Sequence, residues 1–231
     1  MIIPSFKITE IFYSIQGEGI FAGLPMIFIR FTGCNLRCKW CDTPYSYSGG
    51  SDMDLEEIME NIKPYTSNTV FLTGGEPLIQ NSINSLVDRL LRENYRVIIE
   101  TNGSIDISHF SGSEVIISMD IKCPSSGMSK YNKISNLSLL KETDQLKFVV
   151  FDRNDMDYAF DILKRNIISA QVVFQPVFGT DIKDMASYFL HECDAYVESV
   201  GKKCLHGNHI YNQPRFTIQQ HKIIWGDERG V

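Results

Sequence analysis

The stretch MIFIRFTGCNLRCKWCDT, residues 26–43, joins an apolar run directly to three closely spaced cysteines. The run Met26–Phe31 has the length and composition of a buried strand. Cys34, Cys38 and Cys41 follow it with the spacing C-x3-C-x2-C, and no fourth cysteine lies nearby. Structural zinc sites and ferredoxin-type clusters are normally held by four protein ligands. Three thiolates around a four-iron cluster would leave one iron free to bind a small molecule.

Two simpler explanations of the cysteines remain open at this point. A C-x2-C pair in an intracellular chain is also found in redox sites and in half of a zinc site. More distant side chains would then complete the set of ligands. The candidates for such partners are Cys123, Cys193, Cys204, His206 and His209.

Outward from this stretch, apolar runs alternate with segments of helical periodicity. We expect buried strands at Met26–Phe31, Thr69–Leu72, Arg96–Glu100, Val115–Met119, Leu146–Phe151 and Val172–Gln175. We expect helices after a capping box at Asp54–Glu57, near Ile83–Glu93, near Asp155–Arg165 and near Asp181–Cys193. Repeated strand–helix units predict an α/β fold with a parallel sheet. About six strands are fewer than the eight of a closed barrel, so we predict a partial (β/α) barrel in a single domain, residues 1–231.

Composition narrows the classes of function. The chain has 231 residues, 43% of them hydrophobic, and a net charge of −6. It has no long basic run, so we expect no nucleic-acid partner. No signal peptide or membrane-spanning run is recognisable, so we expect no membrane contact. Clustered thiols in a chain of this length are typical of metal ligands in a reducing cytoplasm rather than of disulfides.

Polar motifs follow several of the predicted strands, where α/β folds carry their sites. Thr73-Gly74-Gly75-Glu76-Pro77 combines glycines, which let the backbone approach a ligand, with acceptors for an ammonium group. A plain turn is the simpler interpretation of the Gly-Gly pair alone. Glu100–Gly103, Asp120–Lys122 and Gln175-Pro176 occupy the same place after later strands. Their repeated position predicts a ring of polar groups at one edge of the sheet.

With these motifs the chain resembles the radical S-adenosylmethionine (SAM) enzymes. The features shared with them are C-x3-C-x2-C with an aromatic residue before the third cysteine, and Gly-Gly-Glu-Pro one strand later. Further motifs are similar to those of the 7-carboxy-7-deazaguanine synthases: EIFYSIQGEG at residues 10–19, Gly23-Leu24-Pro25, Arg30-Phe31, Gly33–Cys38, Thr73–Pro77, Glu100–Gly103 and Gln220-His221-Lys222. Together they cover nearly the whole chain.

The resemblance implies a reaction and its cofactors. That family converts 6-carboxy-5,6,7,8-tetrahydropterin to 7-carboxy-7-deazaguanine with loss of ammonia, on the route to queuosine and archaeosine in tRNA. A [4Fe-4S] cluster and SAM would supply a 5′-deoxyadenosyl radical, which takes hydrogen from C6 of the pterin before SAM is re-formed. The resemblance also implies Mg²⁺, an external electron donor and a homodimer.

Roles at the site are carried over by matching positions. The cluster ligands would be Cys34, Cys38 and Cys41, and Thr43 would hold Mg²⁺, although a capping threonine is the simpler interpretation. Substrate positions are matched by Ile15, Gln16, Gly17, Glu18, Arg30, Thr73 and, at the C-terminus, Val231. SAM positions are matched by Trp40, Cys41, Asp42, Gly75, Glu76, Asp120, Ile121, Lys122, Gln175, Pro176, Val177 and Phe178.

The chemistry and the sequence of this chain bear on two of these assignments. An arginine inside the apolar run around Arg30 needs a buried partner, and its guanidinium suits a carboxylate. The family commonly has Ser-Pro-Lys where this chain has Asp120-Ile121-Lys122, so the role of a SAM contact is best carried over to Lys122.

Two other functions remain alternatives: a different radical SAM enzyme, such as a glycyl-radical activase, and a non-catalytic iron–sulfur or zinc module.

Overall fold

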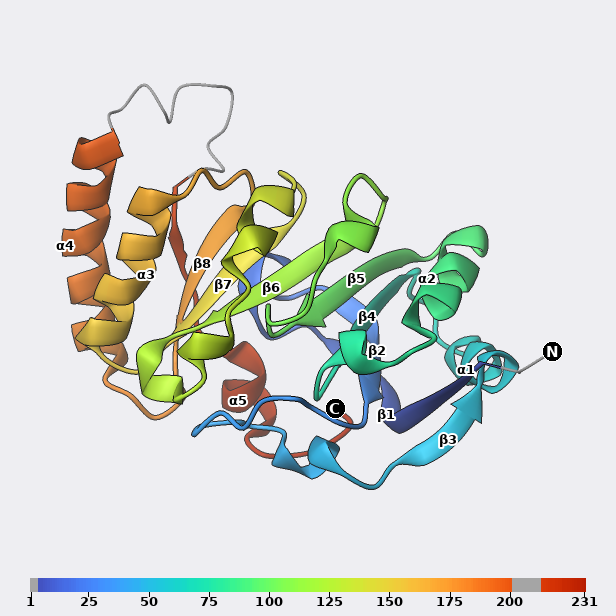
Figure 1. Cartoon of the computed structure of the whole chain (residues 1–231). Helices are drawn as coiled ribbons and strands as arrows, with labels where there is room; N and C mark the ends of the chain where they lie inside the picture. Colours follow the sequence, from blue (N-terminus) through green and yellow to red (C-terminus); the bar gives the residue numbers. More distant parts are fainter. Residues whose placement is uncertain (1–3, 201–212) are drawn as a thin grey trace.

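The fold is built on one nine-stranded sheet, shown in Figure 1, in the order β3-β1-β2-β4-β5-β6-β7-β8-β9. The computed structural model describes residues 4–200 and 213–231. The strands are β1 (Ser5–Ile15), β2 (Pro25–Phe31), β3 (Ser51–Asp54), β4 (Thr69–Gly74), β5 (Arg96–Thr101), β6 (Ile116–Lys122), β7 (Gln145–Val150), β8 (Gln171–Pro176) and β9 (Arg215–Phe216). The helices are α1 (Leu55–Ile62), α2 (Ile83–Arg92), α3 (Arg153–Arg165), α4 (Ile182–Val200) and α5 (Gln220–Trp225).

The predicted parallel strands are all present. β2, β4, β5, β6, β7 and β8 pair in parallel, each with the next. The predicted helices are present as well, and α4 continues beyond the predicted end at Cys193. Short 3-10 turns, rather than α-helices, connect β5 to β6 and β6 to β7. The prediction of a partial barrel is confirmed, since the sheet is mostly parallel and bears helices on its outside.

Two strands before and after the cysteine loop were not predicted. β1 pairs antiparallel with β2 and with β3, so the sheet is mixed rather than wholly parallel. The register of β1 shifts between Ile8 and Glu10. Such an irregularity breaks the two-residue alternation of apolar side chains that would have identified the strand.

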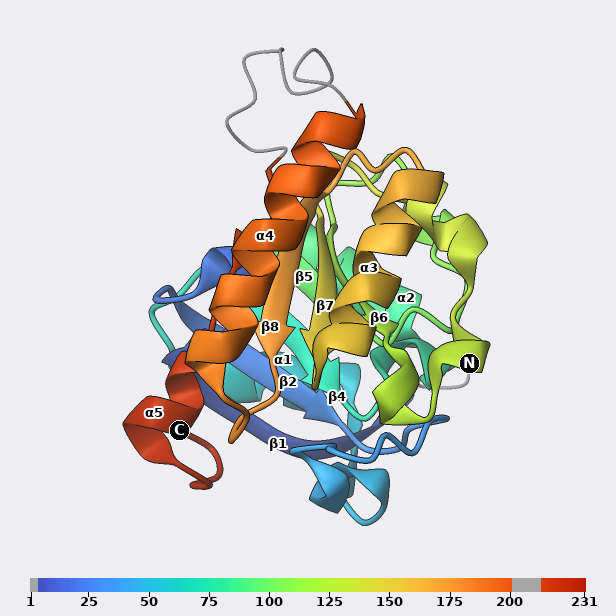
Figure 2. The ribbon, with the colours of Figure 1, turned by 90° about the vertical axis from the view of Figure 1, so that its left-hand side faces the viewer.

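The main core lies between the sheet and the helices on its outer face. Figure 2 shows α3 and α4 side by side over β7 and β8. The capping box of α1 is formed: Glu57 N donates to the Asp54 carboxylate, and Asp54 N donates to the Glu57 carboxylate. Within the described residues, no helix is long and apolar enough to cross a membrane.

On the inner face of the sheet, the side chains of β2 and β4 change from apolar to polar toward the carboxyl ends of the strands. Side chains of a strand alternate between its two faces, so residues two apart share a face. On β2 and β4, Phe28 and Phe71 pack in a small apolar cluster, and Arg30 and Thr73 follow two residues later. The parallel register places Arg30 beside Thr73. Polar groups from successive strands therefore gather at the carboxyl ends of the strands.

Candidate functional site

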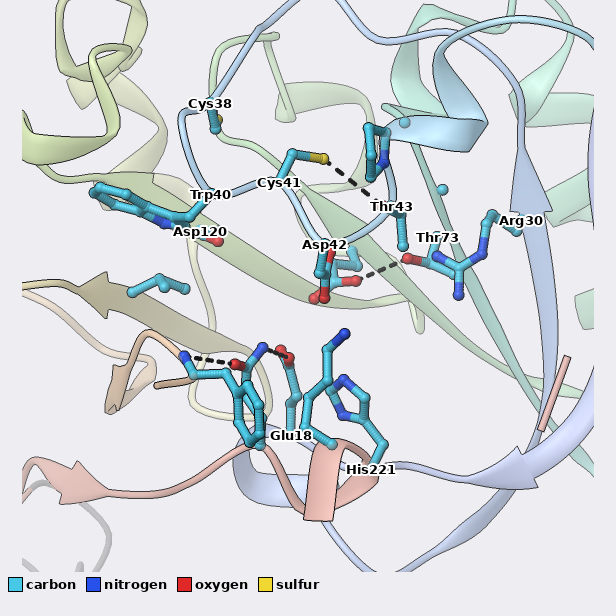
Figure 3. Close-up of a pocket in the computed structure, with 18 of the residues that line it drawn as sticks. Glu18, Arg30, Cys38, Trp40, Cys41, Asp42, Thr43, Thr73, Asp120 and His221 are labelled. Atoms are coloured by element: carbon cyan, nitrogen blue, oxygen red, sulfur yellow. Dashed lines mark hydrogen bonds between the residues drawn. The ribbon is translucent and has the colours of Figure 1, made fainter. Parts of the chain in front are cut away.

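A cavity of about 590 Å³ opens at this end of the sheet. In Figure 3, Trp40 and Asp120 lie at one end of the pocket, and Thr73 and Arg30 lie at the other. Most of the predicted site residues line it: Ile15, Gln16, Glu18, Arg30, Cys34, Cys38, Trp40, Cys41, Asp42, Thr43, Thr73, Gly75, Asp120, Lys122, Gln175, Val177, Phe178 and Val231. The structure thus brings together residues from Ile15 near one end of the chain to Val231 at the other.

Three predicted contact residues lie behind the wall of the cavity instead. The backbone oxygen of Gly17 accepts a hydrogen bond from Gln220 N at 2.9 Å, and a Cβ at Gly17 would meet His221 at 2.4 Å. Gly17 therefore seats α5 against the site. Ile121 is fully buried in the main core. Pro176 is the buried last residue of β8. That these three residues contact a ligand stays a prediction.

Glu76 is likewise not a lining residue. Its side chain is fully buried, and its carboxylate accepts hydrogen bonds from Leu78 N at 3.0 Å, Thr101 Oγ1 at 2.9 Å and Asn102 N at 2.7 Å. The predicted role as acceptor for a ligand's ammonium group is therefore wrong for this side chain. It ties the loop after β4 to the loop after β5. Burial raises the pKa of Glu76 to about 7, against the effect of these donors.

The cysteine loop is anchored by backbone contacts. Glu76 N donates to Gly33 O at 2.8 Å, and Gly33 N donates to Ser46 O at 2.8 Å. A Cβ at Gly75 would lie 1.8 Å from Gly33 O, so only glycine fits there. The plain-turn interpretation of the Gly-Gly pair therefore misses its role, which is to let the loop after β4 approach the cysteine loop.

The thiols of Cys34, Cys38 and Cys41 are free, half-buried and directed to one side of the cavity. Burial raises the pKa of Cys34 and of Cys38. Asn102 Nδ2 lies 3.9 Å from Cys34 Sγ, and Leu36 N lies 3.4 Å from it. N–H groups near a sulfur are typical of cluster ligands. The donor set fits a cluster with three protein ligands.

The proposed distant partners do not complete a four-ligand site within the described residues. Cys123 also borders the cavity, but it is 1% exposed and its thiol is directed to Ile121 O at 3.9 Å. Cys193 lies on α4 and packs against the main core. Cys204, His206 and His209 lie outside the described residues.

Arg30 has the buried partner that its apolar surroundings require. Its Nε donates to Glu10 Oε1 at 2.6 Å, and Tyr45 Oη donates to the same oxygen at 2.9 Å. The guanidinium also lies near the rings of Phe12 and Tyr45. Within the described part of the chain, this leaves its terminal nitrogens for a ligand. Arg229, near the C-terminus, stacks on Tyr45 at 3.9 Å.

A buried ion-pair network forms the floor of the cavity. Lys147 Nζ, on a side chain 4% exposed, donates to Glu18 at 2.6 Å and to Glu100 at 2.7 Å. Thr73 Oγ1 donates to the other oxygen of Glu100 at 2.8 Å. Burial opposes the charge of Lys147, but Glu100 and Glu18 raise its pKa well above the ordinary value. Burial also opposes the charge of Glu18, but Lys147 and other donors hold its pKa below the ordinary value.

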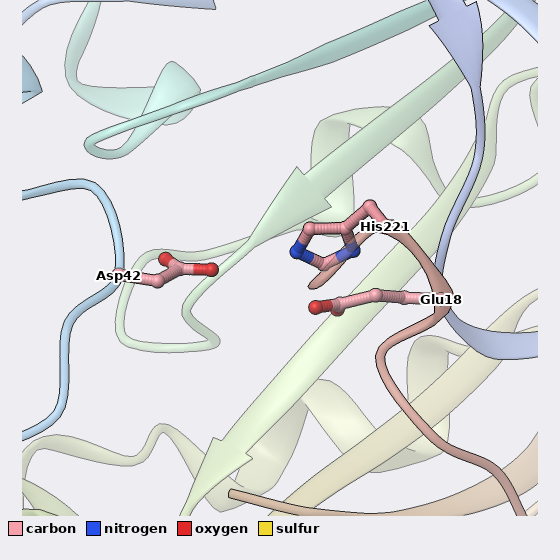
Figure 4. Close-up of side chains that lie close together, drawn as sticks. All are labelled: Glu18, Asp42 and His221. Carbon is pink, nitrogen blue, oxygen red and sulfur yellow. The ribbon is translucent and has the colours of Figure 1, made fainter. Parts of the chain in front are cut away.

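Glu18, Asp42 and His221 point toward one another across the cavity, as Figure 4 shows. Their ligand atoms lie within 4.8 Å of one another, a spacing that a metal ion could use. Both oxygens of Glu18 already accept hydrogen bonds, from Lys147 and from Gln219 Nε2 at 2.8 Å. Burial and the Glu18 charge raise the pKa of Asp42. With an ammonium already beside Glu18, the trio suits the donors of a flat organic ligand better than a cation.

At the other end of the cavity, several polar atoms lack partners among the described residues. Asp120 Oδ1 and both polar atoms of the Gln175 side chain are buried without a hydrogen bond. Buried polar atoms are rarely left unpaired, so a ligand is expected to meet them. Lys122 Nζ donates to the other oxygen of Asp120 at 2.9 Å. Asp120 thus offers a hydrogen-bond acceptor to a ligand, and Gln175 offers a donor and an acceptor.

Thr43 lies between the cysteine loop and the charged floor of the pocket (Figure 3). It precedes the 3-10 turn Pro44–Tyr47, but its side chain makes no capping hydrogen bond. The hydroxyl lies 3.8 Å from Cys41 Sγ. Its side chain therefore caps nothing, but its backbone oxygen accepts hydrogen bonds from Ser46 N at 3.0 Å and from Ser46 Oγ at 2.8 Å, so the simpler interpretation as a turn threonine remains open beside the magnesium role.

Sequence reasoning missed several residues of the site. Lys147 interrupts the apolar strand β7, and a buried cation in such a strand is a recognisable sign of a buried partner. The contacts of Glu10 with Arg30 and Tyr45 depend on the register of β1, and β1 was not predicted. Gln219 and His221 had no predicted role at the site, and Glu100 was predicted only as a member of the polar ring after the strands.

Comparison with known proteins agrees with this site. The profile of the Radical SAM superfamily matches residues 28–134, which include the cysteine loop and the motif after β4. A 7-carboxy-7-deazaguanine synthase of Thermoplasma acidophilum is 42% identical over 225 residues, covering 97% of this chain and 99% of that protein. One of Methanospirillum hungatei is 43% identical over 80% of this chain and 78% of its own length.

A solved structure agrees with the fold. The crystal structure of QueE from Escherichia coli aligns with a TM-score of 0.72 over 94% of this chain and 95% of that chain. At 23% sequence identity, this likeness concerns the fold alone. The identity to full-length relatives carries the assignment: the chain belongs to the 7-carboxy-7-deazaguanine synthase family of the Radical SAM superfamily.

Proposed function

We propose that this protein converts 6-carboxy-5,6,7,8-tetrahydropterin to 7-carboxy-7-deazaguanine with release of ammonia. One observation carries the proposal: a single cavity joins a three-thiol loop to the Arg30–Glu10 pair and to the buried pair of Lys147 with Glu18. The thiols suit a reactive cluster, and the network suits a small ligand with a carboxylate and several hydrogen-bond donors. The reaction is a lyase reaction in the biosynthesis of 7-deazapurines.

The cofactors belong to the thiol end of the cavity. Cys34, Cys38 and Cys41 would hold a [4Fe-4S] cluster, with SAM between Trp40, Asp120 and the other residues of that end. Bound together, these groups supply a radical that removes a hydrogen atom from the substrate. The protein binds and orients both partners and excludes water and stray hydrogen donors.

The substrate belongs to the charged end. The free edge of the Arg30 guanidinium would take the substrate carboxylate in a two-pronged ion pair. Glu18 would accept hydrogen bonds from the amino-pyrimidinone edge, and Lys147 keeps Glu18 ionised for that purpose. Ile15, Gln16, Thr73 and Val231 border the same region.

Three further assignments are part of the proposal. Mg²⁺ would bind Thr43 together with substrate oxygens and water, since the ion prefers oxygen and retains water. An external protein would donate the electron that primes the cluster. The enzyme would work in the cytoplasm, where its thiols stay reduced. It would be a homodimer.

The direct test is incubation of the reconstituted, dithionite-reduced protein with SAM and the carboxytetrahydropterin. We expect 7-carboxy-7-deazaguanine and ammonia in equal amounts, measured by mass spectrometry and an ammonia assay. Cys38→Ala is the matched control, because it should lose the brown cluster and the product together. If the wild-type protein is fully loaded with iron and forms no product, the proposed function is wrong.

A further inference from the structure

The outer surface of the cysteine loop carries exposed cations without acidic partners. Arg37 and Lys39 lie between the cluster cysteines in sequence, and both are exposed. The loop packs against residues 126–128: Lys39 N donates to Ser126 O at 3.2 Å, and Arg37 N lies 3.4 Å from Met128 Sδ. Lys130 follows on the same segment and is exposed as well. Among the described residues, the ion pairs include none of these three cations.

The charge of these two segments differs from that of the whole chain. The chain has 28 acidic residues against 22 basic ones. Segments 33–41 and 121–140 contain no aspartate or glutamate at all. Their basic residues are Arg37, Lys39, Lys122, Lys130 and Lys133. Lys122 is paired inside the cavity and Lys133 is paired with Asp106, so the other three set the outward charge of these two segments. Beside Phe151, the Asp155 carboxylate is buried and accepts hydrogen bonds from Ser125 N and Phe151 N, both at 2.9 Å.

This basic surface lies directly behind the thiols. Lys39 adjoins Cys38, whose sulfur borders the cavity on the inner side of the same loop. Exposed aromatic rings belong to the neighbouring elements: Phe151 is 49% exposed and stacks on Trp40 with ring centroids 5.5 Å apart, and Tyr131 is 48% exposed. Aromatic residues and arginine are enriched in protein-binding surfaces, and the two lysines add the positive charge that can steer an acidic partner.

We propose that the surface formed by Arg37, Lys39, Lys130, Tyr131 and Phe151 is the docking site of an acidic one-electron carrier protein. This inference rests on the proposed function, which requires a cluster at the three thiols. In the transfer, the carrier is oxidised by one electron and the cluster is reduced by one electron, with no bond made or broken. Docking here brings the carrier to the outer side of the loop that holds the thiols.

A nucleic acid would fit this surface less well. Nucleic-acid sites present a basic stripe that follows many phosphates. Here three cations stand on a protein of net charge −6, which repels an extended polyanion. A compact acidic protein can instead match the local charge, and electron-transfer complexes commonly have such small, charge-steered interfaces.

The test uses cluster-loaded enzyme and a purified acidic flavodoxin as the probe carrier. The patch variant Lys39→Glu/Lys130→Glu reverses two exposed charges and leaves Arg37 in place, because the Arg37 guanidinium donates to Cys34 O and Leu36 O within the loop. The matched control is Arg92→Glu/Lys164→Glu, the same charge change on exposed residues in the last turns of α2 and α3. Binding is measured at low and high ionic strength, and the cluster spectrum reports reduction by the reduced flavodoxin.

We expect the patch variant to bind flavodoxin at least about tenfold more weakly than the wild type and the control at low salt, and to be reduced correspondingly slowly. The difference should vanish near 1 M salt, where charges are screened within about 3 Å. With dithionite the patch variant should form product like the wild type. Failure of all variants with dithionite would refute the proposed function, while the binding comparison would still report on the surface. Equal flavodoxin binding by the patch variant, the control and the wild type would overturn the inference. So would a patch variant that binds tRNA more weakly than the wild type but binds flavodoxin equally well.

Discussion

At the scale of the residue, Arg30 combines a structural ion pair with a proposed ligand contact. Glu10 takes its Nε, so the charge is compensated within the protein before any substrate binds. We expect Arg30→Ala to weaken pterin binding about a hundredfold or more, because one charge-assisted pair with the substrate carboxylate is lost. Arg30→Lys should also bind poorly, since lysine cannot form the two-pronged contact. Titration calorimetry measures both affinities.

Glu10→Gln is the matched control for Arg30. It removes the structural pair but keeps the guanidinium in the cavity, so substrate affinity should fall much less. SAM binding and the cluster spectrum should be unchanged in all three variants. Arg30 would be purely structural if Arg30→Ala bound the pterin like the wild type.

Thr43 supports a second prediction at this scale. With a single protein ligand, Mg²⁺ would be held mainly by substrate oxygens and water, so its affinity should depend on substrate. Magnesium should raise the turnover rate, because it positions the substrate carboxylate, and it should barely affect SAM binding. Thr43→Ala should lose much of this response and keep the cluster spectrum, whereas Thr43→Ser should retain it. Full turnover by chelator-treated wild type would show that no such ion is needed.

At the scale of the element, the buried charge of Lys147 on strand β7 is compensated by two carboxylates from other segments, Glu18 and Glu100. Replacing Lys147 by methionine leaves Glu18 and Glu100 without their shared counter-ion in a buried place. We expect a loss of about 3–5 kcal/mol in the free energy of unfolding, measured by urea denaturation. The triple variant Glu18→Gln/Glu100→Gln/Lys147→Met should regain most of the stability, because no charge is left uncompensated. It should still fail to bind the pterin, which separates the structural role of the network from its binding role.

Glu76 links the loops after β4 and β5, and its buried carboxyl should make stability depend on pH. The folded protein keeps a proton on this group up to pH about 7, whereas the unfolded chain releases it near the ordinary value of 4.5. The folded state therefore binds the extra proton, and its stability falls as pH rises through this window. The unfolding free energy of the wild type minus that of Glu76→Gln should therefore fall by about 3 kcal/mol between pH 4.5 and pH 7.

Glu114→Gln, at an exposed carboxyl, serves as the control and should leave the pH curve unaltered. A difference between wild type and Glu76→Gln that rises with pH would mean that Glu76 is ionised when folded. The three donors around its carboxylate would then outweigh burial.

The elements differ in how well the sequence predicts them. Strands β4 to β8 are rich in apolar residues, although Lys147 interrupts β7, and such stretches are easy to recognise. β1 has a register shift near Ile8, and its apolar positions change parity there. β3 has four residues and β9 has two, too few for a recognisable strand pattern, so their pairing depends on neighbours rather than on local preference.

At the scale of the whole molecule, the sequence predicts which ends of the strands carry the site, but not how its side chains pair. Parallel topology alone places Arg30, Thr73, Asp120 and Gln175 at one edge of the sheet. The contact of Lys147 with Glu18 joins residues 129 positions apart, and no local pattern encodes it. Motif matching also assigned Glu76 to the ligand, although three-dimensional packing turns its carboxylate into the protein.

In the proposed reaction, one cavity holds the pterin at its charged end with C6 within reach of SAM at its thiol end. The most direct measurement uses a substrate that carries deuterium at C6, followed by mass spectrometry of the SAM recovered after turnover. We predict that deuterium appears in SAM with wild-type enzyme and is absent with Cys38→Ala. Product formation without any deuterium in SAM, or deuterium retained at C6, would contradict this account of the site.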